Sequence, residues 1–162
     1  MQNLECSFLN GSVCMISSGN KADAINELIQ KASVLHIIDN KKHFSREVLS
    51  RERKQTTGFG HGVAVAHAQY QGLHSVVMAL GVSRQGIEYQ AMDNMPVHLL
   101  FLIASPPSLH DEYLRALSVL VKLVRQQYFR NNLLAASTLG EIEQILHTNF
   151  CSLLKKEQKF AV

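Results

Sequence analysis

The sequence has few residues that interrupt or cross-link a fold, and no segment long enough to cross a membrane. Its 162 residues include three prolines and nine glycines, and 46% are hydrophobic against 18% charged, which argues against a disordered, collagen-like or linker-dominated chain. The longest apolar run, residues 99–104, is far shorter than the roughly 20 residues that span a bilayer. The N-terminal residues show no signal-peptide pattern. We therefore expect a compact cytoplasmic protein with no membrane insertion.

Cysteine is also scarce, and the spacing of the three cysteines matches no common cysteine motif. Cys6, Cys14 and Cys151 form no Cys-x-x-Cys pair, and their odd number argues against a disulfide framework. A closed zinc site built on cysteine pairs has no support for the same reason. We expect free thiols.

A metal site built on histidine is the remaining metal hypothesis. His61, His67 and His74 follow one another at intervals of six and seven residues, and Asp93 or Asp111 is available as a carboxylate ligand. These spacings match no standard zinc pattern. We therefore predict no metal, and a metal-dependent enzyme stays only as an alternative.

Positive charge is concentrated rather than abundant. The formal net charge is +3, yet six of the sixteen lysines and arginines lie within residues 41–54. Such a stretch can face an anion, but it is equally typical of the solvated side of a helix followed by a loop. We predict no nucleic-acid binding.

The hydrophobic periodicity predicts a single α/β domain. Short apolar runs predict strands, and apolar residues at helical spacing after polar caps predict helices. The run at 97–104 is apolar on both faces except at His98, as in an interior strand, so a mixed sheet flanked by helices on both faces is expected. The expected elements are a strand at 12–16, helices at 20–33 and 45–54, strands at 63–68, 75–82 and 97–104, a helix opened by a capping box at 108–111, and a last helix from 138 that frays near 155.

Glycines crowd one segment in the middle of the chain. Gly58, Gly60 and Gly62 occupy alternate positions, where glycine allows tight turns and a close approach of the backbone to a ligand. The spacing is neither a dinucleotide fingerprint nor a P-loop, because Val63 stands where the former needs glycine and no Gly-Lys-Ser/Thr follows. A nucleotide site is disfavoured, and a plain loop is the alternative to an anion cradle.

One histidine stands out by its position after this segment. His67 closes the small apolar strand that begins at Val63, and strand ends are common places for exposed chemistry. A neutral imidazole is a competent nucleophile near pH 7. The alternative is a hydrogen-bonded histidine at the edge of the core.

Two motifs in a fixed order resemble a known family. The first motif consists of Arg51-Glu52, Thr57-Gly58, Gly60, Gly62 to Val65 and His67. The second is the run at 91–101, which reads Ala-Met-Asp-Asn-Met-Pro-Val-His-Leu-Leu-Phe. Together they resemble the enzyme IIA domains of the mannitol/fructose class in the bacterial phosphotransferase system. The resemblance covers residues 12–147 and is closest to the nitrogen-related enzyme IIA proteins. It implies one domain over residues 1–162 with a mannitol/fructose-like enzyme IIA fold.

The resemblance also implies a mechanism and its residues. His67 would accept a phosphoryl group from an HPr-type phosphocarrier protein, and Arg51 would clamp the phosphate. The group would pass to a IIB protein or act as a regulatory switch on a kinase or transporter. No cofactor is implied, because the donor is a protein phosphohistidine. The residues implied to bind phosphate are Thr57, Gly58, Gly60 and Gly62.

This chain departs from the family pattern at several positions. Ala66 replaces the proline before the active histidine, Tyr113 replaces the second histidine, and His98 replaces an aspartate. His110 lies one helical turn before Tyr113, so either residue is a candidate hydrogen-bond donor. The alternative function is a non-catalytic interaction protein that keeps the enzyme IIA fold.

Overall fold

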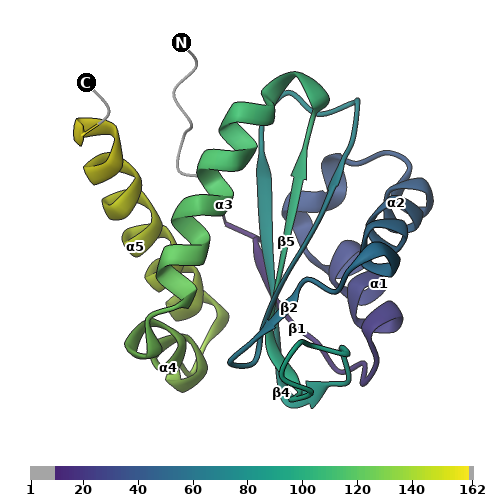
Figure 1. The fold of residues 1–162 in the computed structure, drawn as a ribbon, viewed down its shortest axis with the longest axis horizontal. Coiled ribbons are helices and arrows are strands. Elements are labelled where there is room, and N and C mark those ends of the chain that lie inside the picture. The colour runs from purple at the N-terminus through teal and green to yellow at the C-terminus, as the bar shows by residue number, and fades with distance from the viewer. Residues whose placement is uncertain (1–9, 161–162) are drawn as a thin grey trace.

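The computed structural model describes residues 10–160, and these residues contain a five-stranded mixed sheet (Figure 1). The strand order is β1-β4-β5-β3-β2. Pairs β1/β4 and β3/β5 are parallel, whereas β4/β5 and β2/β3 are antiparallel. The predicted mixed sheet is confirmed. The strands are β1 (Val13–Met15), β2 (Gly58–Gly60), β3 (Val63–Gln69), β4 (Val77–Ile87) and β5 (Val97–Ser105).

Helices cover both faces of this sheet, as predicted (Figure 1). One layer holds α1 (Lys21–Lys31), the 3-10 helix η1 (Ser33–Ile37) and α2 (Lys41–Lys54). The other holds α3 (His110–Val124), α4 (Gln127–Ala135) and α5 (Leu139–Phe160), and a short 3-10 turn η2 (Pro107–Leu109) leads into it. Each layer buries its own apolar cluster against the sheet. Within residues 10–160, no helix is long and apolar enough to cross a membrane.

The two N-terminal helices show which start signals could be predicted. Asn20 caps α1 as predicted, because its side chain accepts a hydrogen bond from the Asp23 amide at 2.9 Å. The predicted start of the second helix at residue 45 is wrong. Asn40 caps α2 by accepting from the His43 amide at 3.0 Å, so the basic stretch is already helical from its first lysine.

The C-terminal layer corrects two further predictions. The capping box at 108–111 does not form, since η2 occupies this segment and Leu109, the N-cap of α3, makes no side-chain cap. The last helix does begin at the predicted signal, with Thr138 accepting from the Glu141 amide at 3.2 Å. It continues to Phe160 instead of fraying, because Leu154 is buried and Glu157 pairs with a lysine of α3.

The cysteines follow the free-thiol expectation only in part. Cys14 is free and buried, and burial raises the pKa of its thiol to about 11. Cys151 is disulfide-bonded, so the expectation is wrong there. Cys6 lies outside the described residues.

Candidate functional site

His67 lies where the buried strand β3 emerges from the core. The first four residues of β3 are buried, and the strand becomes half-buried at His67. Alternation along a strand places His67 on the same face as Val63 and Val65, which belong to the cluster under α3–α5. Consistent with this, its ring centroid lies 5.5 Å from that of Tyr113 on α3. Ala66 points to the opposite face and is fully buried.

A surface hollow of about 340 Å³ opens in front of His67. It brings together four residues that the sequence analysis selected: His67 from β3, Arg51 from α2, and His110 and Tyr113 from α3. These residues are up to 62 positions apart in the chain. The complete lining is Glu47, Ser50, Arg51, Lys54, His67, Ala68, Gln69, Ser105, His110 and Tyr113.

The two ring nitrogens of His67 differ in their surroundings. Nδ1 is buried and has no hydrogen-bond partner, which leaves Nε2 as the nitrogen that a reactant can approach. Burial is the main cause that lowers the pKa of His67 below 6.5, and the positive charge of Arg51 lowers it further. The polar backbone of Val65 and then the charge of Glu52 oppose this shift more weakly. His67 is therefore a neutral imidazole at pH 7, the form that acts as a nucleophile.

Arg51 offers a partly fixed guanidinium to the hollow. Its Nη1 donates to the Gln55 carbonyl at 2.9 Å, a group at the carboxyl end of α2. This contact uses only part of the planar set of five donors on an arginine. The remaining donors and the positive charge are available to an anion in front of His67.

Tyr113 contributes a neutral hydroxyl to the same hollow. Burial raises the pKa of its phenol, with Arg51 acting weakly in the opposite direction, so the group stays protonated and can donate one hydrogen bond. The ring of His110 lies 5.9 Å from the Tyr113 ring, centroid to centroid. His110 is exposed and Tyr113 is half-buried, and both candidate hydrogen-bond donors line the hollow in front of His67.

The structure does not bring the four predicted phosphate-binding residues to His67. None of them lines the hollow. Gly58 and Gly60 belong to strand β2, which pairs with the start of β3 and places Gly58 opposite Ala64. A Cβ added at Gly62 would lie 3.5 Å from Cδ2 of His98. The hydroxyl of Thr57 donates to Glu52. Close packing at Gly58 and the positive φ of Gly60 and Gly62 give this glycine spacing a structural role.

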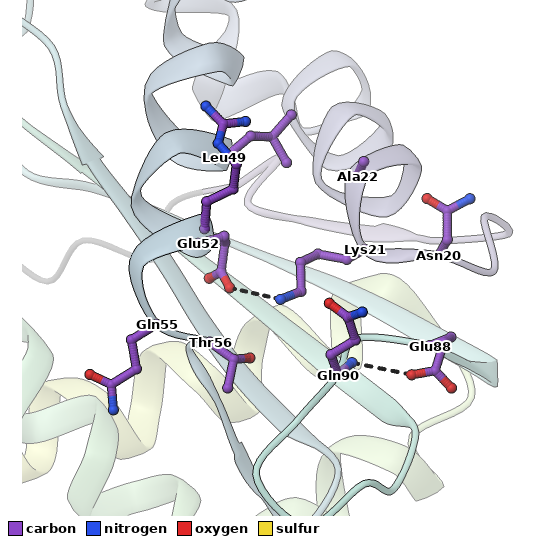
Figure 2. A pocket seen from close by; sticks show the side chains of 10 residues that line it. Asn20, Lys21, Ala22, Leu49, Glu52, Gln55, Thr56, Glu88 and Gln90 are labelled. Atoms are coloured by element: carbon purple, nitrogen blue, oxygen red, sulfur yellow. Dashed lines mark hydrogen bonds and ion pairs between the residues drawn. The ribbon is translucent and has the colours of Figure 1, made fainter.

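A second, larger hollow of about 710 Å³ lies on the other side of the last turn of α2 (Figure 2). At its base the Lys21 ammonium pairs with the Glu52 carboxylate at 3.3 Å and lies 4.6 Å over the Tyr89 ring. The Tyr89 hydroxyl donates to Glu52 at 2.9 Å. This buried network was missed by the sequence analysis, although Glu52 follows Phe44 and Val48 at helical spacing, which places it on the buried face of α2.

Three further histidines, His61, His74 and His98, do not line the hollow in front of His67. His98 binds the Ser83 carbonyl through Nδ1 at 2.8 Å, a structural role within the sheet. His61 and His74 are exposed. Over residues 10–160, no group of three or more potential metal-ligating side chains is positioned to hold an ion.

Comparisons with known proteins agree with this fold. The family model described as "Phosphoenolpyruvate-dependent sugar phosphotransferase system, EIIA 2" matches residues 10–149. The fructose-specific EIIABC component of Bacillus subtilis is 30% identical over 132 residues, which cover 82% of this chain but only 21% of that protein. The chain thus spans about a fifth of this relative.

Solved structures extend the comparison. The nitrogen regulatory protein IIA-Ntr of Neisseria meningitidis superposes with a TM-score of 0.75 at 26% identity, over 83% of this chain and 91% of that one. Enzyme IIA mannitol of Escherichia coli, solved in complex with phosphorylated enzyme IIB mannitol, shares the fold with a TM-score of 0.66 at 14% identity, over 85% and 95% of the chains. The chain belongs to the type 2 EIIA family of the phosphotransferase system, a family of phosphoryl carriers.

Proposed function

We propose that His67 accepts a phosphoryl group from the phosphohistidine of an HPr-type carrier and passes it to a IIB protein or holds it as a regulatory switch. One observation carries this proposal. The Nδ1 atom of His67 is buried without a partner, so the neutral ring presents Nε2 to a hollow that also contains Arg51. We place this activity in the cytoplasm, where such carriers act.

The transfer balances without a cofactor. The P–N bond of the donor phosphohistidine breaks as a P–N bond to Nε2 of His67 forms, and the donor imidazole leaves with the electron pair. The transition state is loose and spreads charge over three phosphoryl oxygens, so alignment and positive charge supply most of the catalysis. Arg51 stabilises these oxygens, while Tyr113 or His110 donates a hydrogen bond. The low pKa of His67 keeps Nε2 unprotonated and ready to attack.

The known relatives support two uses of the same chemistry. One is named a fructose-specific EIIABC component and another a nitrogen regulatory protein. In the first use the phosphoryl group goes to a IIB protein and supports sugar uptake. In the second, phosphorylation controls a kinase or transporter. Both begin with the same phosphorylated histidine, so the site proposal does not depend on the choice.

Labelling with phosphoenolpyruvate and the general phosphotransferase proteins tests the proposal. The wild-type protein should take up one acid-labile phosphoryl group, and His67→Ala should take up none. His74→Ala is the matched control, because His74 is exposed and outside the hollow, and it should label like wild type. A wild type that takes no label, or a labelled His67→Ala, would refute phosphotransfer at His67 and favour a non-catalytic interaction protein.

A further inference from the structure

A phosphoryl group on His67 brings close to two negative charges into the hollow, by analogy with other phosphorylated side chains. The groups already described supply little to balance them. Arg51 carries one positive charge and commits one of its donors to the Gln55 carbonyl. Tyr113 stays neutral because burial raises the pKa of its phenol. A second positive charge in the hollow would balance the second negative charge of the phosphoryl group.

Lys54 meets this need by its position on α2. Four residues of this helix line the hollow, at positions 47, 50, 51 and 54, which is the i, i+3, i+4, i+7 spacing of one helical face. Lys54 and Arg51 are three residues apart and therefore neighbours on that face. Arg53, although adjacent in sequence, lines the larger hollow instead.

Within residues 10–160 the ammonium of Lys54 has no carboxylate partner, a property shared by Lys41, Lys42, Lys155, Lys156 and Lys159, but none of those other lysines lines the hollow in front of His67. Lys21, Lys31 and Lys122 form ion pairs with glutamates. Glu47 is the one carboxylate in the lining of the hollow, and it belongs to no ion pair in the same part of the chain. The positive charge of Lys54 is thus left for an incoming anion.

We propose that Lys54 is the second cation of the phosphate site and binds the phosphoryl oxygens together with Arg51. This inference rests on the proposed function of His67. The long, flexible side chain places three donors at its end, which lets the ammonium follow the phosphoryl group as a partner protein approaches and leaves. Lys54 contributes charge to binding, while Arg51 contributes charge and orientation.

Titration with inorganic phosphate, followed through the ring resonances of His67 by NMR, tests this role without a carrier protein. Lys54→Met should weaken phosphate binding by about fivefold, the size expected for one exposed charge pair. Lys54→Arg keeps the charge and should bind within about twofold of wild type. Arg53→Met removes the adjacent charge on the other side of the helix and should also bind within about twofold.

The outcomes separate this inference from the proposed function. Equal binding by Lys54→Met and wild type overturns the role of Lys54, as does an equal loss in Arg53→Met or a wild type whose His67 resonances do not respond to phosphate. A wild type that binds phosphate beside His67 but takes no label from the carrier proteins refutes phosphotransfer alone. Label on His67 with no effect of Lys54→Met on phosphate binding refutes the Lys54 inference alone.

Discussion

The two hollows on either side of the last turn of α2 differ in a way that their sizes do not reveal. The larger one, of about 710 Å³, is lined by two cations and two carboxylates, and Lys21 and Glu52 are paired at its base (Figure 2). The smaller one, of about 340 Å³, has two cations against one carboxylate and an imidazole nitrogen without a partner. Unsatisfied charge and hydrogen-bonding capacity, not volume, mark the candidate site.

One helix produces this difference. Consecutive residues on an α-helix point about 100° apart, so Arg51 faces the smaller hollow while Glu52 faces the buried network and the larger one. The Arg-Glu pair that carries part of the family resemblance therefore has two roles in this chain. Arg51 is available to a ligand, whereas Glu52 ties the end of α2 to α1 through Lys21.

The largest effect should come from breaking the network of the larger hollow. Glu52→Ala leaves the Lys21 ammonium and the hydroxyls of Thr57 and Tyr89 without their acceptor. We expect the free energy of unfolding to fall by about 3 kcal/mol, measured by urea denaturation. Glu88→Gln alters an exposed residue of the same hollow and should change stability by less than about 0.5 kcal/mol. A Glu52→Ala protein as stable as wild type would contradict the structural role of this hollow.

Arg51→Met should have the opposite profile. The rate of phosphoryl uptake should fall about a hundredfold, as when one charge-stabilising donor is removed from a reaction centre. Stability should change little, because Arg51 is only half-buried and, among residues 10–160, its side chain hydrogen-bonds to the Gln55 carbonyl alone. Arg53→Met should label at the wild-type rate. Equal losses in the two variants would mean that charge on α2 acts at long range, not from within the hollow.

The glycine segment gives a third test of the division between structure and chemistry. A Cβ added at Gly58 would lie 2.8 Å from the Ala91 Cβ and 2.9 Å from the Tyr89 ring. We expect Gly58→Ala to destabilise the fold by about 2 kcal/mol through overpacking, with phosphate binding at His67 unchanged in the folded protein. Thermal denaturation measures the loss of stability. Gly19→Ala is the matched control, because an added Cβ there meets nothing within 4 Å. Weaker phosphate binding by folded Gly58→Ala would instead support the hypothesis that the glycine segment binds the anion.

The smallest effect concerns the protonation of His67. Its pKa should lie below 6.5, since burial and then Arg51 disfavour the imidazolium. Because the folded state lowers this pKa, the contribution of His67 to stability is fully present above the unfolded pKa of about 6.5 and is lost as the pH falls from that value through the lower folded pKa. In an NMR titration, Arg51→Met should raise the pKa of His67 only part of the way back, since burial remains. An unchanged pKa in Arg51→Met would place the guanidinium away from the ring.

Local patterns in the sequence predicted much of this fold. Alternation and helical spacing identified the strands β3 and β5 and the buried face of α1, because each side chain there meets the core at a fixed period. Asn20 predicted the start of α1 because its side chain accepts a hydrogen bond from the amide of Asp23, only three residues along the chain. The pairing of Arg51 with His67 across the chain came from the family resemblance, since spacing alone gives no distance between a helix and a strand.

What the sequence did not predict depends on contacts between distant segments. Glu52, Lys21 and Tyr89 meet only in the folded chain, and only the burial of Glu52 left a signal in the helical period. The glycines read as a loop because strand β2 is short and its need for small residues comes from Ala91 and Tyr89 packed against it. No single-residue pattern reports such an approach of one backbone to another.

NMR of the His67 imidazole nitrogens before and after incubation with phosphoenolpyruvate and the carrier proteins is the most direct test of the account. Phosphorylation should appear at Nε2 of His67, with Nδ1 still enclosed by the protein, and should disappear on mild acid treatment. Phosphate found on Nδ1 or on another residue, or a ring unchanged by active carrier proteins, would contradict the assignment of this hollow as the phosphoryl site.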